Sequence, residues 1–218
     1  LRERLGHHGD TLRGGVAEEG VVLLADLAGY SRICATLVDR DVRSAEEIGG
    51  FLNRLAGPMA ECIAEHGGSV LSFVGDATIA VWAAPDPETA AEVAARAVAC
   101  GLALQRLVGA QQDPLLGPVW LKVAVDAGPI WVADVGLGAA QRHLHAAGPI
   151  LEAMPELGTL AEPGEVAIPL PLGERIGKAV TGTARGDALI VSGVALPSRP
   201  LPPPRPAPGS EQHVTPST

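Results

Sequence analysis

The order in which short apolar runs alternate with long amphipathic stretches constrains the fold of this chain more than any other feature. The first run, GVVLLADL at 20–27, is almost continuously apolar, as expected of a central strand buried on both faces. A helix is predicted over 44–68, where Ser44 and Glu47 form a capping box, apolar residues keep helical spacing and Gly-Gly ends the segment. Pro58 is expected to kink or divide this helix.

Two further strands and a second long helix follow. SVLSF at 69–73 and TIAVW at 78–82 predict a hairpin, and the next segment predicts a helix over 87–108. The segment VWLKVAVDAGPIWVADVG at 119–136 predicts a second strand pair, hinged at Ala127-Gly128-Pro129.

The resulting β-α-β-β-α-β-β order is typical of one fold class. It predicts an α+β fold with a ferredoxin-like βαββαβ core and extra elements, in which the sheet is covered by helices on one face. A receiver domain with a phosphoacceptor aspartate would also place an acid at a strand end. That domain has a repeating β-α-β order and a parallel sheet, and the two predicted hairpins argue against it.

Composition sets the domain boundaries. The chain has 218 residues, 47% of them hydrophobic and 19% charged, which predicts a folded body with one sizeable core. We expect an N-terminal extension at 1–16, one domain at 17–194, and a proline-rich disordered tail or linker at 195–218. Eight of the last 22 residues are proline, and such a segment has too few large apolar side chains to form a core.

Charge and cysteine content exclude several classes of function. The formal net charge of −9 argues against binding to nucleic acid or to an anionic membrane surface. No apolar run approaches the roughly 20 residues of a membrane span. Cys34, Cys62 and Cys100 are widely spaced, so their pattern predicts buried free thiols in a reducing, cytoplasmic compartment rather than disulfides or a zinc site.

Two aspartates interrupt apolar strands at their ends. Asp76 follows Gly75 in the turn of SFVGDATIAVW, and Asp26 ends the first strand. Turn chemistry alone explains the first, and a helix N-cap alone explains the second. In a ferredoxin-like order, however, the first strand lies beside this hairpin, so the two carboxylates are expected to face each other. They would repel unless a cation such as Mg²⁺ or Mn²⁺ lay between them.

A pair of such ions can activate a hydroxyl and neutralise a leaving pyrophosphate, which points to phosphoryl chemistry. The turn after the first aspartate strengthens this hypothesis. Leu27-Ala28-Gly29-Tyr30-Ser31 has the sequence of a strand-to-helix turn, whose free backbone N–H groups are suited to holding a triphosphate. An acidic protein can bind a nucleotide in this way.

Four segments in this order resemble the catalytic domain of the class III adenylyl and guanylyl cyclases, over roughly residues 17–170. The amino-acid sequences of the first two segments most resemble the first catalytic half of soluble adenylyl cyclase. The matching segments are VVLLADLAGYSR, HGGSVLSFVGDATIAVW, LKVAVDAGPIWVADVG and AAGPILEAMPELGTLAEPGEVAI.

The resemblance implies a role for each matching position. Asp26, Asp76 and the Leu27 carbonyl would bind two Mg²⁺ or Mn²⁺ ions. The residues that would hold the phosphates of ATP, expected in preference to GTP, are Ala28, Gly29, Tyr30, Ser31 and Gly75.

Three positions depart from the family pattern. Ser72 stands where the family has a Lys or Glu that reads the purine, and Glu152 and Glu156 stand where it has an Asn and an Arg that stabilise the transition state. Carboxylates there have the wrong sign for an anionic transition state. We therefore expect the metal-carrying half of a dimeric site, completed by a second cyclase domain in cis or in trans. The alternative is a catalytically degenerate domain that binds nucleotide or dimerises to regulate a partner.

Several other polar and aromatic residues leave a functional role open. Lys122 and Asp126 are four residues apart on one predicted strand, so both side chains are expected on the same face. They either bind a ligand or form a solvated or paired surface. Arg142 is a weak phosphate candidate, and we expect a surface or lining role for His143 and His145 rather than a metal pair. The three tryptophans are expected as core or interface anchors: Trp82, Trp120 and Trp131.

Overall fold

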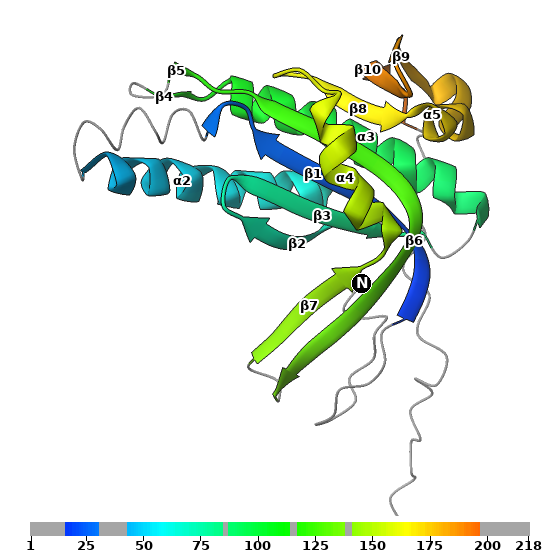
Figure 1. Ribbon diagram of the computed structural model, residues 1–218, viewed down its shortest axis with the longest axis horizontal. Coiled ribbons are helices and arrows are strands. Elements are labelled where there is room, and N and C mark those ends of the chain that lie inside the picture. The colour runs from blue at the N-terminus through cyan, green and yellow to red at the C-terminus, as the bar shows by residue number, and fades with distance from the viewer. Residues whose placement is uncertain (1–15, 31–42, 85–86, 114–116, 138–140, 197–218) are drawn as a thin grey trace, which may run out of the picture.

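The computed structural model describes residues 16–30, 43–84, 87–113, 117–137 and 141–196. Figure 1 shows a twisted sheet with long helices packed along it. The main elements in chain order are β1 (Val16–Leu27), α2 (Arg43–Glu65), β2 (Ser69–Val74), β3 (Ala77–Ala83), α3 (Pro87–Gly109), β4 (Gln112–Asp113), β5 (Gly117–Pro118), β6 (Leu121–Leu137), β7 (Gln141–Ala147), α4 (Pro149–Thr159), β8 (Val166–Pro169), α5 (Leu170–Ile176), β9 (Val180–Arg185) and β10 (Ala188–Val194).

The sheet has the predicted ferredoxin-like core. Its order is β2-β3-β1-β6-β8-β10-β9, with β7 paired to the outer part of β6. β1 is antiparallel to both β3 and β6, and β3 is antiparallel to β2, so β1 and β2 run in the same direction on either side of β3. This arrangement of a split βαβ unit confirms the predicted fold class.

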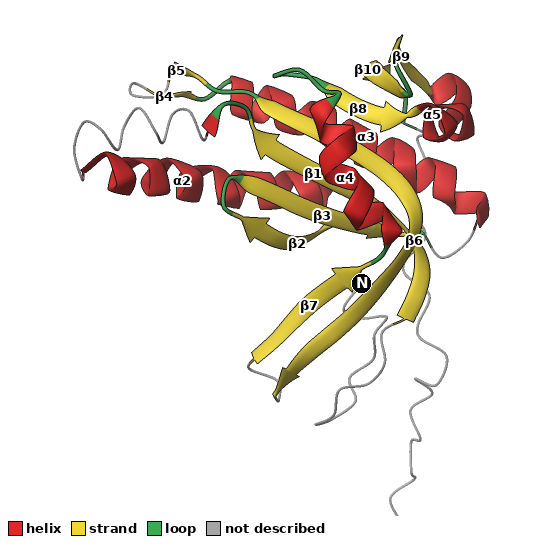
Figure 2. Ribbon diagram, in the orientation of Figure 1, coloured by secondary structure: helices red, strands yellow, loops and turns green. Residues whose placement is uncertain are grey.

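Helices cover both faces of the sheet, whereas the sequence predicted cover on one face. One core lies beneath α2 and α3 and takes Val21 and Leu23 of β1. The other takes Val22 and the apolar stripe of α4, whose buried residues are Ile150, Met154 and Leu157. Figure 2 shows α4 crossing the sheet on the side away from α2 and α3. β1 is thus buried on both faces, as predicted.

The predicted strand pair at 119–136 is wrong. β6 runs without a turn from Leu121 to Leu137, and β1 pairs with it over twelve positions, with Gly20 opposite Gly128 and Glu19 opposite Pro129. Because this ladder holds the segment extended, the strand curves at these residues and does not reverse (Figure 1). The reversal comes later, between β6 and β7.

Pro58 does not divide the predicted helix, because α2 is one helix from Arg43 to Glu65. Pro58 lies on its exposed side, where solvent can satisfy the carbonyl that loses its helical partner. In the part of the chain that the structure describes, no helix is both long and apolar enough to cross a membrane. The expected tail from 197 onward lies outside the described residues.

Candidate metal and nucleotide site

The turn between β2 and β3 brings Asp76 to the end of β1. Val74 pairs with Ala77, so Gly75 and Asp76 form a two-residue turn, in which Gly75 has a φ of 62° that favours glycine. Ala77 in turn pairs with Asp26 of β1. The carboxylates of Asp26 and Asp76, fifty positions apart in the sequence, therefore meet at one edge of the sheet.

The electrostatics of this edge favour a bound cation. Burial is the main cause that raises the pKa of Asp26, and the negative charge of Asp76 and a side-chain hydrogen bond with it raise this pKa further. Lys122 and the backbone N–H of Leu27 act in the opposite direction. Two carboxylates that repel each other in this way offer hard oxygen ligands, which fit Mg²⁺ or Mn²⁺. The donor set present is suited to the ions that the sequence predicted.

Lys122 belongs to this edge as well. It lies directly opposite Asp26 in the β1–β6 ladder, and its charge lowers the pKa of that carboxyl. From the sequence, Lys122 could either bind a ligand or belong to a solvated or paired surface. The alternation along β6 predicts which face of the sheet Lys122 is on, but not which residue lies beside it on the neighbouring strand. A positive side chain beside the aspartates is suited to the charge of a triphosphate.

A cavity of about 270 Å³ adjoins the Asp76 turn. Gly75, Asp76, Leu27 and Leu121 are among the residues that line it. Apolar residues on α2 and β2 complete the lining, among them Leu52, Leu55, Met59 and Phe73. The Asp76 turn thus adjoins an apolar surface of α2.

The turn after β1 differs in one respect from the expected phosphate-binding loop. The Ala28 N–H donates a hydrogen bond to the Trp120 carbonyl, at 2.8 Å, and is not available to a phosphate. Gly29 is exposed in the left-handed region with a φ of 79°, and Tyr30 begins a helical turn. Ser31 lies outside the described residues. The phosphate role therefore remains a prediction for Gly29, Tyr30, Ser31 and Gly75.

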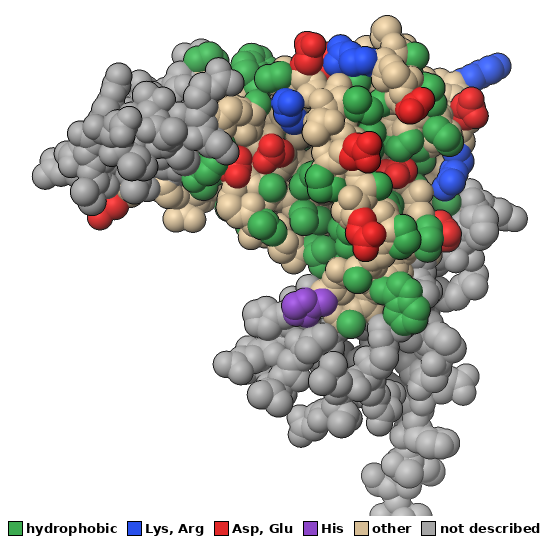
Figure 3. Space-filling view, viewed as in Figure 1, with side chains coloured by type: hydrophobic (Ala, Val, Ile, Leu, Met, Phe, Trp, Pro, Cys, Tyr) green, Lys and Arg blue, Asp and Glu red, His purple; other side chains and the backbone are tan. Residues whose placement is uncertain are grey.

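The three positions that depart from the family pattern lie on β2 and α4. Ser72 is half-buried in β2, opposite Ile79 of β3. Glu152 and Glu156 are exposed on α4, one turn apart, on the side that faces away from the sheet. Figure 3 shows acidic and hydrophobic side chains interspersed over the face of the molecule that α4 covers. The glutamates thus face solvent.

Solved structures of similar architecture include guanylyl and adenylyl cyclase domains. The guanylyl cyclase Cya2 is 23% identical, with a TM-score of 0.69 over 85% of this chain and 98% of that one. The guanylyl cyclase domain of the RhoGC fusion protein from Blastocladiella emersonii has 15% identity and a TM-score of 0.71, over 84% of this chain and 100% of that one. The adenylyl cyclase CyaB from P. aeruginosa has 18% identity and a TM-score of 0.62, over 85% and 97%.

This chain has the fold of the class III nucleotidyl cyclase catalytic domain. No family model and no curated protein sequence matches it. The structural matches include both adenylyl and guanylyl cyclases, so they do not distinguish ATP from GTP.

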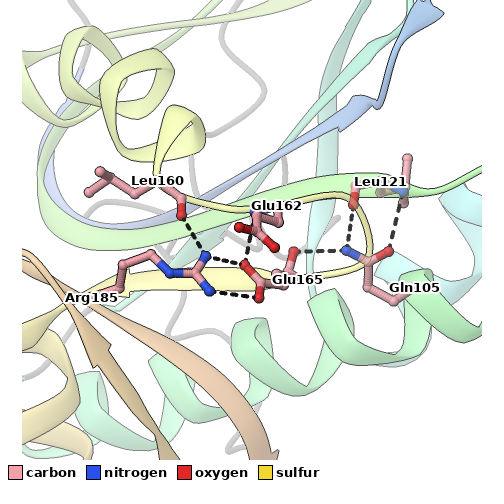
Figure 4. Close-up of polar contacts among 6 residues, drawn as sticks. All are labelled: Gln105, Leu121, Leu160, Glu162, Glu165 and Arg185. Carbon is pink, nitrogen blue, oxygen red and sulfur yellow. Dashed lines mark hydrogen bonds and ion pairs between the residues drawn. The ribbon is translucent and has the colours of Figure 1, made fainter.

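A buried glutamine anchors the start of β6 in this cyclase fold, and sequence reasoning missed it. The Gln105 side-chain amide donates to the carbonyls of Leu121 and Glu165, both at 2.8 Å, and its oxygen accepts from the Leu121 N–H at 3.3 Å (Figure 4). Glu165 is also held by a two-pronged ion pair with Arg185. The sequence feature that could have indicated this anchor is a single Gln within the apolar stripe of α3. Gln105 fixes the strand position next to Lys122.

The remaining candidates are the three tryptophans, the residues around His145, and Asp126. Trp82 is buried as predicted, but Trp120 and Trp131 are 43% and 56% exposed and do not belong to the core. His145 is exposed, as expected, while the side chains of Arg142 and His143 lie outside the described set. Burial raises the pKa of Asp126, whose carboxylate accepts a 2.7 Å hydrogen bond from the Ala127 N–H.

Proposed function

We propose that this cyclase-fold domain supplies the metal-binding half of a nucleotidyl cyclase site that two such domains share, and that the site converts ATP to cyclic AMP and pyrophosphate. The contact between Asp26 and Asp76 at the end of β1 is the observation that carries the proposal. The preference for ATP rests on the sequence resemblance to soluble adenylyl cyclase.

Asp26, Asp76 and the Leu27 carbonyl would hold Mg²⁺ or Mn²⁺. When bound, these ions lower the pKa of the attacking hydroxyl and offset the charge of the leaving pyrophosphate. Lys122 beside Asp26 would offset phosphate charge, and the backbone of Gly29, Tyr30 and Ser31 would orient the triphosphate. In the reaction the 3′ oxygen of the substrate attacks the α-phosphorus, its proton is lost, and the bond to pyrophosphate breaks.

The domain would depend on a partner for the opposite wall of the site. Glu152 and Glu156 are exposed on α4, and carboxylates at these positions oppose the charge that develops on the transferred phosphorus. A second cyclase domain with cationic and purine-reading residues would complete the site. The aspartates of that second domain would not be needed for metal binding in this site.

A second candidate function follows from the same two glutamates and Ser72. A domain that lacks the transition-state and purine residues is suited to binding a metal-nucleotide complex, or to dimerising, as a regulatory module. In this case nucleotide binding through Asp26 and Asp76 persists, but no partner domain restores turnover.

Cyclase assays with Mn²⁺-ATP and Mn²⁺-GTP test the shared-site proposal. The chain alone is expected to form no more cyclic nucleotide than Asp76→Ala. The double variant Glu152→Asn/Glu156→Arg, which restores the family residues, should gain activity in its homodimer and lose it again when Asp76→Ala is added. Robust turnover by the unaltered homodimer would overturn the half-site assignment, and a nucleotide-binding double variant without turnover would favour the regulatory module.

A further inference from the structure

A cluster of metal-ligating side chains lies between α2 and α3, in the core on their side of the sheet. Cys62 and His66 are one helical turn apart at the end of α2, and Cys100 faces them from α3. Both cysteines are buried free thiols, and His66 is half-buried. One ligand atom from each residue lies within 4.8 Å of the other two. The wide spacing of the cysteines in the sequence did not predict this cluster, because it joins two helices that meet only in the fold.

The distances within the cluster are close to those of a metal site. The Cys62 Sγ lies 3.9 Å from the His66 Nδ1. Ligand atoms around a tetrahedral zinc ion are separated by roughly 3.5–3.8 Å, given Zn–S and Zn–N bonds of about 2.3 and 2.0 Å. The cluster would therefore contract by about 1 Å on binding. The His66 Nδ1 also contacts the Cys62 carbonyl at 2.7 Å, and a ring rotation would direct a nitrogen to the ion.

The chemistry of the donors selects the kind of cation. Thiolate and imidazole are ligands for Zn²⁺ and not for Mg²⁺ or Mn²⁺, which prefer oxygen. Both thiols would lose their proton on binding, so two thiolates, a neutral imidazole and Zn²⁺ form a site without net charge. A neutral complex is favoured in a buried position, where an uncompensated charge is costly.

We propose that Cys62, His66 and Cys100 bind Zn²⁺, with a water molecule as the fourth ligand on the half-buried His66 side. The site joins α2 to α3, and it is separate from the carboxylates of Asp26 and Asp76. The proposal does not depend on cyclase activity.

Trp82 supports this site from β3. Its indole Nε1 donates a 2.9 Å hydrogen bond to the His66 carbonyl, and its ring packs against Gly68. The backbone that carries His66 is thereby fixed to the sheet. A metal ion here would tie α2, α3 and β3 together, so its expected effect is on the stability of the domain.

Zinc binding to the whole chain tests the proposal. Protein purified under reducing conditions is stripped with a chelator, given Zn²⁺, dialysed and assayed for metal content. A parallel titration with Co²⁺ reports thiolate coordination by its charge-transfer absorption. We expect about one Zn²⁺ per chain in the unaltered protein, in the cysteine control Cys34→Ala, and in Asp26→Asn/Asp76→Asn, which lacks the other carboxylate site.

Cys62→Ala and Cys100→Ala each remove a direct ligand, so each is expected to weaken zinc binding by at least the roughly ten- to hundredfold that loss of an outer-shell partner costs, and to reduce the cobalt–thiolate absorption. His66→Gln, at a half-buried position, provides a variant that keeps both core thiols if the cysteine variants fail to fold. Zn²⁺ should raise the Tm of the unaltered chain and of Cys34→Ala, but not that of His66→Gln. Equal zinc content in the unaltered chain and in His66→Gln, without a cobalt–thiolate band in either, would overturn the proposal and leave the cluster as packing alone.

Discussion

Lys122 of β6 lies directly opposite Asp26 of β1, beside the turn that carries Asp76. This pairing places one cation against two carboxylates at a single edge of the sheet. Burial and Asp76 raise the pKa of Asp26, whereas Lys122 lowers it, so the three residues form one electrostatic unit. Changing any one of them should alter the behaviour of the others.

Lys122→Met should weaken the binding of Mn²⁺-ATP by about tenfold, because it removes a charge-assisted contact to phosphate worth about 1.5 kcal/mol. Isothermal titration calorimetry measures the affinity. Lys178→Met, which removes an exposed lysine in the short 3-10 helix Gly177–Ala179 after α5, is the matched control. Equal affinities for the two variants would show that Lys122 does not contact the nucleotide.

Asp26→Asn should stabilise the metal-free chain at neutral pH. The pKa of Asp26 is raised above its ordinary value of 3.8, so the folded state binds its proton more tightly than the unfolded state does. This contribution to stability is fully present below the unfolded-state pKa of 3.8 and is lost as the pH rises through the raised pKa of the folded state.

The variant is therefore expected to be more stable than the parent at pH 7, by less than about 1 kcal/mol because the carboxyl is partly exposed, and to match it below the unfolded-state pKa of 3.8. Urea denaturation across this range measures the difference. Asp187→Asn, an exposed aspartate in the β9–β10 turn, controls for the change in net charge. A difference that grows as the pH falls would contradict the account.

Gln105→Ala should destabilise the domain by about 2–4 kcal/mol, because it leaves backbone groups of Leu121 and Glu165 without their buried partner. Arg185→Ala removes an exposed ion pair with Glu165 and a hydrogen bond to the Leu160 carbonyl, and it should destabilise the domain less because solvent screens these contacts. Urea denaturation of both variants gives the comparison. If the ion pair, and not the glutamine, held this part of the fold, Arg185→Ala would be the more destabilising of the two variants.

Gly68→Ala and Gly49→Ala should change stability in opposite directions. A Cβ at Gly68 would lie 2.5 Å from the Trp82 ring, and overpacking of this kind costs about 1–3 kcal/mol. A Cβ at Gly49, in the first half of α2, meets nothing within 4 Å, so alanine should stabilise the helix by about 0.5–1 kcal/mol. Thermal unfolding of the two variants tests whether Trp82 packs as described.

The sequence predicted the order of the core elements because each has a clear hydrophobic period. It also brought Asp26 and Asp76 together, since a ferredoxin-like order fixes which strands are neighbours. It failed at 127–129, where turn-like residues lie in a long strand that pairing with β1 keeps extended. The sequence did not predict features that depend on strand register or on helix packing. These are the pairing of Lys122 with Asp26, the hydrogen bonds of Gln105, and the proximity of Cys62 to Cys100.

The most direct test of the central claim is a calorimetric titration of Mn²⁺-ATP into the chain and into Asp76→Ala. Circular dichroism would first establish that the variant is folded, as expected for a substitution at a half-buried turn position outside the core. The account predicts measurable, saturable binding to the unaltered chain, which Mg²⁺-ATP shares, and a loss of at least tenfold in affinity in the variant. Equal, negligible heat from both proteins would contradict a role for these aspartates in binding metal and nucleotide.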